Sequence, residues 1–168
     1  MGAKMKKEWD SNKIFKGIFP ALLTPITEEG IIRRDGLKKL IDWELYHGAD
    51  GFYIGGATGE CYSMETEARE ELAKEALRVI DGRGRCIVHI GAYSVREGIR
   101  LARQAEKAGA DAISATPPPV YRYGMEETVD YYRQLSEAVD IPMLVYVNYM
   151  LGEQDPTVLM EKVLELPG

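Results

Sequence analysis

Short apolar runs alternate along the chain with longer stretches that mix apolar and polar residues. Five of the runs are short enough to be strands, at residues 17–23, 51–54, 85–90, 111–116 and 143–147. In the stretches that follow them, apolar residues recur every three or four positions, which is the period of an amphipathic helix. This alternation predicts about five βα units built around a parallel sheet.

Local signals also predict where the helices begin and end. The first helix is expected from about Asp35, and glycines at 48 and 109 are placed to end the first and third helices. Serine and aspartate oxygens accept hydrogen bonds from the free amides of a helix N-terminus. Such caps are expected at Ser63, at Ser94 with Glu97 in a capping box, and at Asp155 followed by Pro156.

The stretch "GGATGE", from Gly55 to Glu60, follows the second predicted strand and carries little side chain besides the Thr58 hydroxyl. In parallel βα folds, ligands bind at the carboxyl ends of the strands. Glycines let a ligand approach the backbone, and successive amides can bind an anion. The spacing matches neither a dinucleotide-binding motif nor a P-loop, which favours a small carboxylate. A turn that needs glycine for geometry alone, and a phosphate-binding module, remain open alternatives.

Composition narrows the class of protein. The 168 residues are 45% hydrophobic and 29% charged, as in one soluble globular domain. Acidic residues outnumber basic ones, 27 to 21, for a net charge of −6, so no nucleic-acid partner is expected. No run approaches the ~20 apolar residues of a membrane span, and the charged opening "MGAKMKK" is not a signal peptide. We therefore expect no membrane association.

The few cysteines and histidines do not predict a metal site. Cys61 and Cys86 have the spacing of neither a disulfide framework nor a metal cluster, and His47 and His89 lie far apart in the pattern. Core packing or helix capping is the simpler role for each histidine. A reducing, cytoplasmic location fits this cysteine content.

Several segments together resemble the N-terminal part of the dihydrodipicolinate synthase and N-acetylneuraminate lyase family. They are "GIFPALLTPI", "GFYIGGATGE" followed by "REELAKEAL", "GADAISATPPPVY" and "PMLVY", in the order and spacing of that family. The resemblance implies an α/β fold, a partial TIM (β/α)8 barrel of about five βα units that lacks strand six onward. It covers about residues 14–168, after an N-terminal tail of residues 1–13.

The resemblance also implies a chemistry. Members of the family form a Schiff base between a lysine and a 2-oxo acid, usually pyruvate, and then make or break a carbon–carbon bond without a further cofactor. Thr58 and Tyr146 would relay a proton, which a phenol linked to a hydroxyl can do. The residues implied to bind the small-molecule 2-oxo acid are Gly56, Ala57, Thr58 and Gly59.

Three departures from the family pattern change the expectation. Ala57 stands where many relatives have serine or threonine, so only its amide is left to bind a carboxylate. The family's second tyrosine, supplied across a subunit interface, falls at Val120, and Tyr121 next to it is carried over as a third catalytic candidate. Leu151 lies near the place of a synthase arginine, which favours the N-acetylneuraminate lyase or sugar-acid aldolase side.

The family's Schiff-base lysine stands at the end of strand six, beyond the last predicted unit. The lysines present are expected before the first strand, on helices or in the tail: Lys16; Lys38, Lys39, Lys74, Lys107 and Lys162; Lys4, Lys6, Lys7 and Lys13. Five units cannot close an eight-stranded barrel, so we expect a homo-oligomer or completion by another chain. The chain is then either a lyase that depends on a further segment or a truncated non-catalytic paralogue, which binds a 2-oxo acid or associates with full-length subunits.

Overall fold

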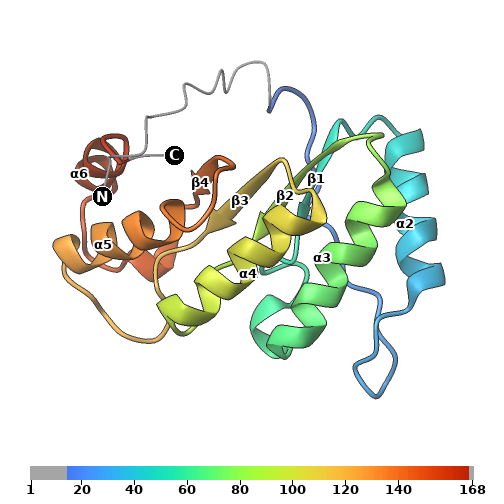
Figure 1. The fold of residues 1–168 in the computed structure, drawn as a ribbon, viewed down its shortest axis with the longest axis horizontal. Coiled ribbons are helices and arrows are strands. Elements are labelled where there is room, and N and C mark those ends of the chain that lie inside the picture. Colours follow the sequence, from blue (N-terminus) through green and yellow to red (C-terminus); the bar gives the residue numbers. More distant parts are fainter. Residues whose placement is uncertain (1–14, 167–168) are drawn as a thin grey trace.

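The computed structural model describes residues 15–166 and contains a parallel sheet of four strands. The strands β1 (Gly51–Ile54), β2 (Arg85–His89), β3 (Ala112–Ala115) and β4 (Met143–Val145) are neighbours in chain order (Figure 1). Parallel strands in sequential order, joined by helices, are the arrangement of a βα barrel. The predicted α/β fold is therefore confirmed, while the predicted tail at residues 1–13 lies outside the described residues.

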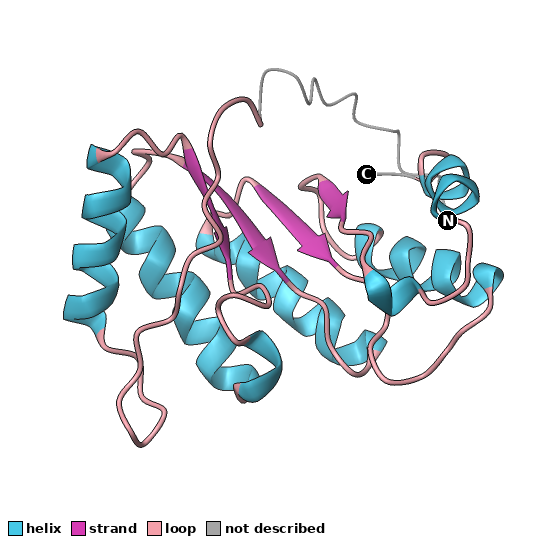
Figure 2. Cartoon of the chain, turned by 180° about the vertical axis from the view of Figure 1, so that it is seen from behind, coloured by secondary structure: helices cyan, strands magenta, loops and turns pink. Residues whose placement is uncertain are grey.

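Helices connect the strands and pack side by side in chain order. They are α2 (Arg34–Tyr46), α3 (Thr66–Ile80), α4 (Val95–Ala108), α5 (Met125–Ser136) and α6 (Pro156–Val163), with short 3-10 turns at Cys61–Ser63 and Tyr149–Leu151. Figure 2 shows the strands in front of helices α3 to α5, which cover one face of the sheet. We call the face toward these helices the outer face and the opposite one the inner face.

Alternate residues of each strand point to opposite faces, and the outer set forms the core. Phe52, Ile54, Val88 and Ile113 belong to one buried cluster with helix residues such as Leu135. Burying a side chain of this size contributes about 1.5–3 kcal/mol. The inner face carries the alternate positions, which include Tyr53, Ile87, His89, Ala112, Ser114 and Leu144.

The predicted first strand, residues 17–23, is wrong as a regular strand. It pairs with β1 through one isolated parallel bridge, Ala21 to Tyr53, with hydrogen bonds from Leu22 N to Tyr53 O and from Tyr53 N to Pro20 O, both 2.9 Å. A longer bond of 3.3 Å runs from Gly51 N to Ile18 O. Pro20 has no N–H to donate, which weakens the ladder. The segment therefore follows β1 as an incomplete edge, and Leu23 remains 54% exposed.

Most predicted helix ends are confirmed, and one is not. Ser94 Oγ accepts a hydrogen bond from Glu97 N, and Asp155 caps α6 ahead of Pro156. Gly48 and Gly109 both have φ of 95°, as glycines beyond a helix end do.

The cap predicted at Ser63 is wrong. Cys61–Ser63 forms a 3-10 turn, and α3 begins only at Thr66, after Glu65, whose side chain forms no cap.

Candidate functional site

The glycine turn, residues 55–60, follows β1 at the carboxyl end of the sheet, as predicted. Each of its three glycines has a structural reason to be glycine, and Gly55 has a φ of 66°. A Cβ on Gly56 would lie 2.6 Å from Tyr53 Cε1, and a Cβ on Gly59 would lie 3.0 Å from the carbonyl oxygen of Leu22. Backbone geometry and close packing thus account for these glycines without a ligand, and a binding site must depend on other groups of the turn.

The backbone amides of the turn are such groups. Gly56 O and Ala57 O accept hydrogen bonds from Cys61 N and Glu60 N, at 3.3 and 3.0 Å. The amides of Ala57, Thr58 and Gly59 donate to no acceptor among residues 15–166, and Ala57 and Thr58 are exposed. Free successive amides of this kind can bind an anion.

Tyr146, the second predicted catalytic residue, directly follows β4 and is 48% exposed. Its backbone N donates to Ala115 O at 2.9 Å, which continues the sheet pairing. Its ring meets that of Tyr53 edge to face, with centroids 6.2 Å apart and an interplanar angle of 74°. Within the described residues no hydrogen bond joins Tyr146 to Thr58, but both the turn and Tyr146 contact Tyr53.

Polar side chains on the inner face form a network that the sequence analysis missed. Tyr53 Oη donates to Ser114 Oγ at 3.0 Å, and Ser114 Oγ donates to Leu144 O at 2.9 Å. Just after the end of β3, the Thr116 hydroxyl lies 2.9 Å from the hydroxyl of Tyr62, which belongs to the 3-10 turn Cys61–Ser63. The signal available in the sequence was the alternation of Tyr53 and Ser114 with buried apolar residues along β1 and β3.

His89 belongs to the same face and holds the start of the glycine turn. It is buried, as expected for packing, and its Nδ1–H donates to Gly55 O at 3.1 Å. Burial and the neighbouring Arg69 guanidinium lower the pKa of His89 to about 4, against the opposing effect of the Gly55 bond. The imidazole is therefore neutral at neutral pH, with Nε2 unprotonated, buried and without a hydrogen-bond partner.

Tyr121, the third predicted catalytic residue, is not brought to the other two. It lies in the loop between β3 and α5, is 70% exposed, and its ring meets that of Tyr123 at a centroid distance of 6.4 Å. The preceding Val120 has φ of 77°, an unusual backbone conformation for a β-branched residue. Any role of Tyr121 would need a group from outside the described part of this chain.

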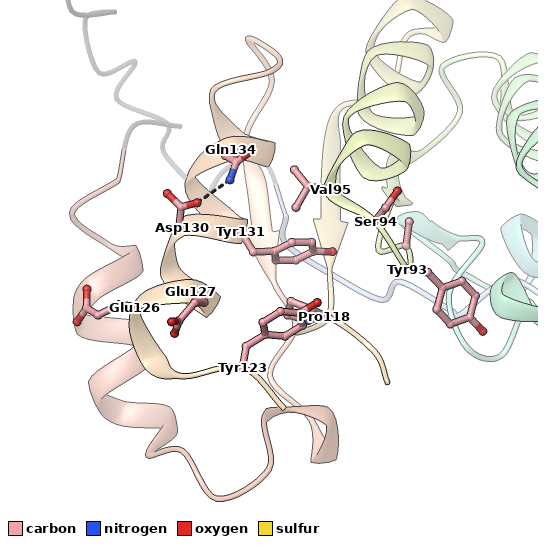
Figure 3. A pocket seen from close by; sticks show the side chains of 11 residues that line it. Tyr93, Ser94, Val95, Pro118, Tyr123, Glu126, Glu127, Asp130, Tyr131 and Gln134 are labelled. Carbon is pink, nitrogen blue, oxygen red and sulfur yellow. Dashed lines mark hydrogen bonds between the residues drawn. The ribbon is translucent and has the colours of Figure 1, made fainter. Parts of the chain in front are cut away.

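A hollow of about 740 Å³ lies between the start of α4 and α5, apart from the predicted site residues. Tyr93, Ser94 and Val95 line one side, and residues of α5 and its preceding loop line the other (Figure 3). Two of its acidic groups already have partners: Asp130 bonds Arg133 and Gln134, and Glu126 pairs with Lys162. Neither Thr58 nor Tyr146 lines this hollow.

The structure also bears on the other candidate groups. Burial raises the pKa of the Cys61 thiol, which makes it a poor nucleophile. Among residues 15–166 no cluster of three or more histidine, cysteine or acidic side chains is placed to hold a metal ion. No helix within that range is both long and apolar enough to cross a membrane.

The lysines that the structure describes lie where they were expected. Lys38, Lys39, Lys74, Lys107 and Lys162 are on helices, and Lys16 is exposed ahead of the sheet. None of these is buried at the carboxyl ends of the strands. The lysines of the tail lie outside the described residues.

Comparison with known proteins shows the family. The family model described as the dihydrodipicolinate synthetase family matches residues 14–163, and the chain belongs to this family. The N-acetylneuraminate lyase of Rhizobium meliloti (strain 1021) is 35% identical over 131 residues, which are 78% of this chain and 44% of that protein. The N-acetylneuraminate lyase of Escherichia coli (strain K12 / DH10B) is 34% identical over 155 residues, 91% and 52% of the two chains.

Solved structures show the same fold. The N-acetylneuraminate lyase of Mycoplasma synoviae (crystal form II) superposes with a TM-score of 0.84 at 35% identity, over 94% of this chain and 54% of that one. YagE from E. coli K12, a prophage protein of the dihydrodipicolinic acid synthase family in complex with pyruvate, gives 0.86 at 29% identity, over 90% and 51%. The chain spans about half the length of the relatives it matches and has the fold of the N-terminal half of their barrels.

Proposed function

We propose that this chain supplies the 2-oxo-acid-binding part of a Schiff-base-dependent lyase or aldolase that cleaves or forms a carbon–carbon bond. The substrate class proposed is pyruvate joined to an aldehyde, on the N-acetylneuraminate lyase or sugar-acid aldolase side of the family. One observation carries the proposal. The glycine turn with its free amides and the Tyr146 phenol both contact Tyr53 at the carboxyl ends of parallel strands.

Each site residue has a role in this proposal. The amides of Ala57, Thr58 and Gly59, next to Gly56, bind the carboxylate of the 2-oxo acid. The Thr58 hydroxyl and Tyr146 Oη move a proton at the reacting carbonyl, a task that general acid–base catalysis assigns to positioned hydroxyl groups. Tyr121 acts only if its exposed loop reaches the site of a second subunit.

The lysine of the Schiff base is proposed to come from elsewhere. The lysines between residues 15 and 166 lie on helices or ahead of the sheet, and none of them follows a strand at its carboxyl end. We propose that further βα units, in another chain or in a homo-oligomer, close the sheet and provide the amine. We also propose a cytoplasmic location. Both cysteines are free and buried, as is common in a reducing compartment.

Calorimetric titration with pyruvate and with phosphate tests the binding part of the proposal. Pyruvate is expected to bind, and Thr58→Val, which keeps the amide but removes the hydroxyl, is expected to retain most of this binding. A preference for phosphate would contradict the carboxylate assignment and favour the phosphate-binding alternative.

Borohydride reduction in the presence of pyruvate, followed by mass spectrometry, tests the covalent part. No reduced adduct is expected on this chain alone. A trapped adduct would show that one of its own lysines forms the Schiff base, which would contradict the proposed need for completion. Binding without activity even beside full-length relatives would favour the non-catalytic paralogue.

A further inference from the structure

The Tyr53 side chain, on the inner face, contacts both halves of the predicted site. On one side its ring carbon Cε1 lies 2.6 Å from where a Cβ of Gly56 would stand, so the turn packs directly on the ring. On another side the ring meets Tyr146 edge to face at 6.2 Å. Any rotation of the Tyr53 ring would therefore displace the turn, the Tyr146 phenol, or both.

The orientation of Tyr53 is fixed through its hydroxyl. Ser114 has a single hydroxyl hydrogen, and it is donated to Leu144 O at 2.9 Å, so Ser114 Oγ acts as the acceptor for Tyr53 Oη at 3.0 Å. The chain of hydrogen bonds thus runs from β1 through β3 to β4, the strand that leads into Tyr146. Because the Tyr53 proton is donated to Ser114, the Tyr53 oxygen can take part in further hydrogen bonds only as an acceptor.

The titration behaviour of Tyr53 fits a supporting role and not that of the proton shuttle. Burial raises the pKa of Tyr53 to about 12, although the hydrogen bond with Ser114 acts in the opposite direction. Tyr53 therefore stays a neutral phenol at neutral pH. The alternative second phenol, Tyr121, lies 70% exposed in a loop, where its ring contacts Tyr123.

We propose that Tyr53 is a positioning residue of the 2-oxo acid site: its hydroxyl, held by Ser114, fixes the Tyr146 phenol beside the glycine turn. The inference rests on the proposed function for its ligand, but the positioning itself is a property of the unliganded chain. The position of Tyr146 then depends on a residue of this chain's own β1 and not on a neighbouring subunit.

Tyr53→Phe tests the inference, because it removes only the hydroxyl and keeps the ring against Gly56 and Tyr146. The full chain is prepared with tyrosine labelled with ¹³C at the hydroxyl-bearing ring carbon, and the Tyr146 signal is assigned by its loss in Tyr146→Phe. Tyr53→Phe is expected to shift the Tyr146 signal without ligand and to weaken pyruvate binding by about 3- to 10-fold, the loss of about one hydrogen bond. Ser114→Ala is expected to do the same.

Tyr62→Phe is the matched control, since it removes another half-buried hydroxyl, one that pairs with Thr116. It is expected to change neither the Tyr146 signal nor the affinity for pyruvate. An unshifted Tyr146 signal in folded Tyr53→Phe, or a shifted signal with unchanged affinity, would overturn the inference. If the unaltered chain does not bind pyruvate, the proposed function fails, and the Tyr146 signal alone still decides whether Tyr53 positions that ring.

Discussion

The two faces of the sheet are made of alternate residues of the same strands, yet they differ in chemistry. On the outer face, Phe52 and Ile113 are fully buried among helix side chains and carry no polar group. On the inner face, Tyr53, His89 and Ser114 are joined to the backbone or to each other by hydrogen bonds. Apolar packing needs no such network, so the outer face secures the fold and the inner face is the place to look for function.

The largest expected effect is on the free energy of unfolding, when a buried side chain of the outer face is shortened. Ile113→Ala on the outer face should lower the free energy of unfolding by about 3 kcal/mol, because it leaves a cavity in the packed core. Urea unfolding measures the loss. Where the variant is still folded, its affinity for pyruvate should be unchanged. A loss below about 1 kcal/mol would mean that the outer face is not the core of the fold.

The inner face is expected to make stability depend on pH through His89. Its folded pKa of about 4 lies below the ordinary value of 6.5, so on acidification the unfolded chain takes up a proton before the folded one does. The free energy of unfolding should therefore fall as pH drops from about 6.5 toward 4, by at most about 3 kcal/mol for this group.

His89→Gln is the control for this pH dependence, since glutamine can still donate to Gly55 O but does not titrate. The carboxylates contribute equally to both proteins, and the difference between the two curves isolates His89. Parallel curves for the variant and the unaltered chain would show that His89 is not held neutral in the fold.

The glycine turn packs against the edge segment and also carries the proposed anion site. A substitution there should therefore lower both the free energy of unfolding and the affinity for pyruvate. Gly59→Ala places a Cβ 3.0 Å from Leu22 O and 3.1 Å from Thr24 Oγ1, which is expected to lower the free energy of unfolding by about 1–3 kcal/mol. Shifting the turn should also weaken pyruvate binding. Full stability with normal binding would show that the contact between turn and edge segment is loose.

The smallest expected effect is on pyruvate affinity, when a hydroxyl is added to the turn at Ala57. Ala57→Ser adds a donor beside the free amides and should tighten pyruvate binding by about 1 kcal/mol, as measured by calorimetry. Ala57→Gly, which keeps the amide and adds nothing, serves as the control. Equal affinity of the serine and glycine variants would place the carboxylate away from this residue.

The sequence predicted the outer face well because burial there follows a simple period. The apolar positions of the helices and of the strands from residue 51 onward repeat at 3.6 and 2 residues, and the structure buries them together. The first strand failed because pairing at an edge depends on neighbours that local sequence does not contain, and Pro20 removes a donor. The cap at Ser63 failed because the chain makes a 3-10 turn before the helix begins.

The inner face was only partly predictable. Thr58 was found from the glycine turn and Tyr146 through the resemblance to a family, and in the structure both follow the carboxyl ends of strands. Tyr53 and Ser114 lie within short, nearly apolar runs, where their alternation with apolar residues was a signal but did not show that they share a face. Their partnership depends on the register that sets β1, β2, β3 and β4 side by side.

The most direct test of the central claim is a map of where pyruvate acts on the chain. Backbone and tyrosine-ring NMR signals are followed while pyruvate is added, with phosphate added to a matched sample. The account predicts that pyruvate shifts the amides of Ala57, Thr58 and Gly59 and the ring of Tyr146 together, with one common affinity. Shifts at only one of these two places, or a stronger response to phosphate, would contradict it.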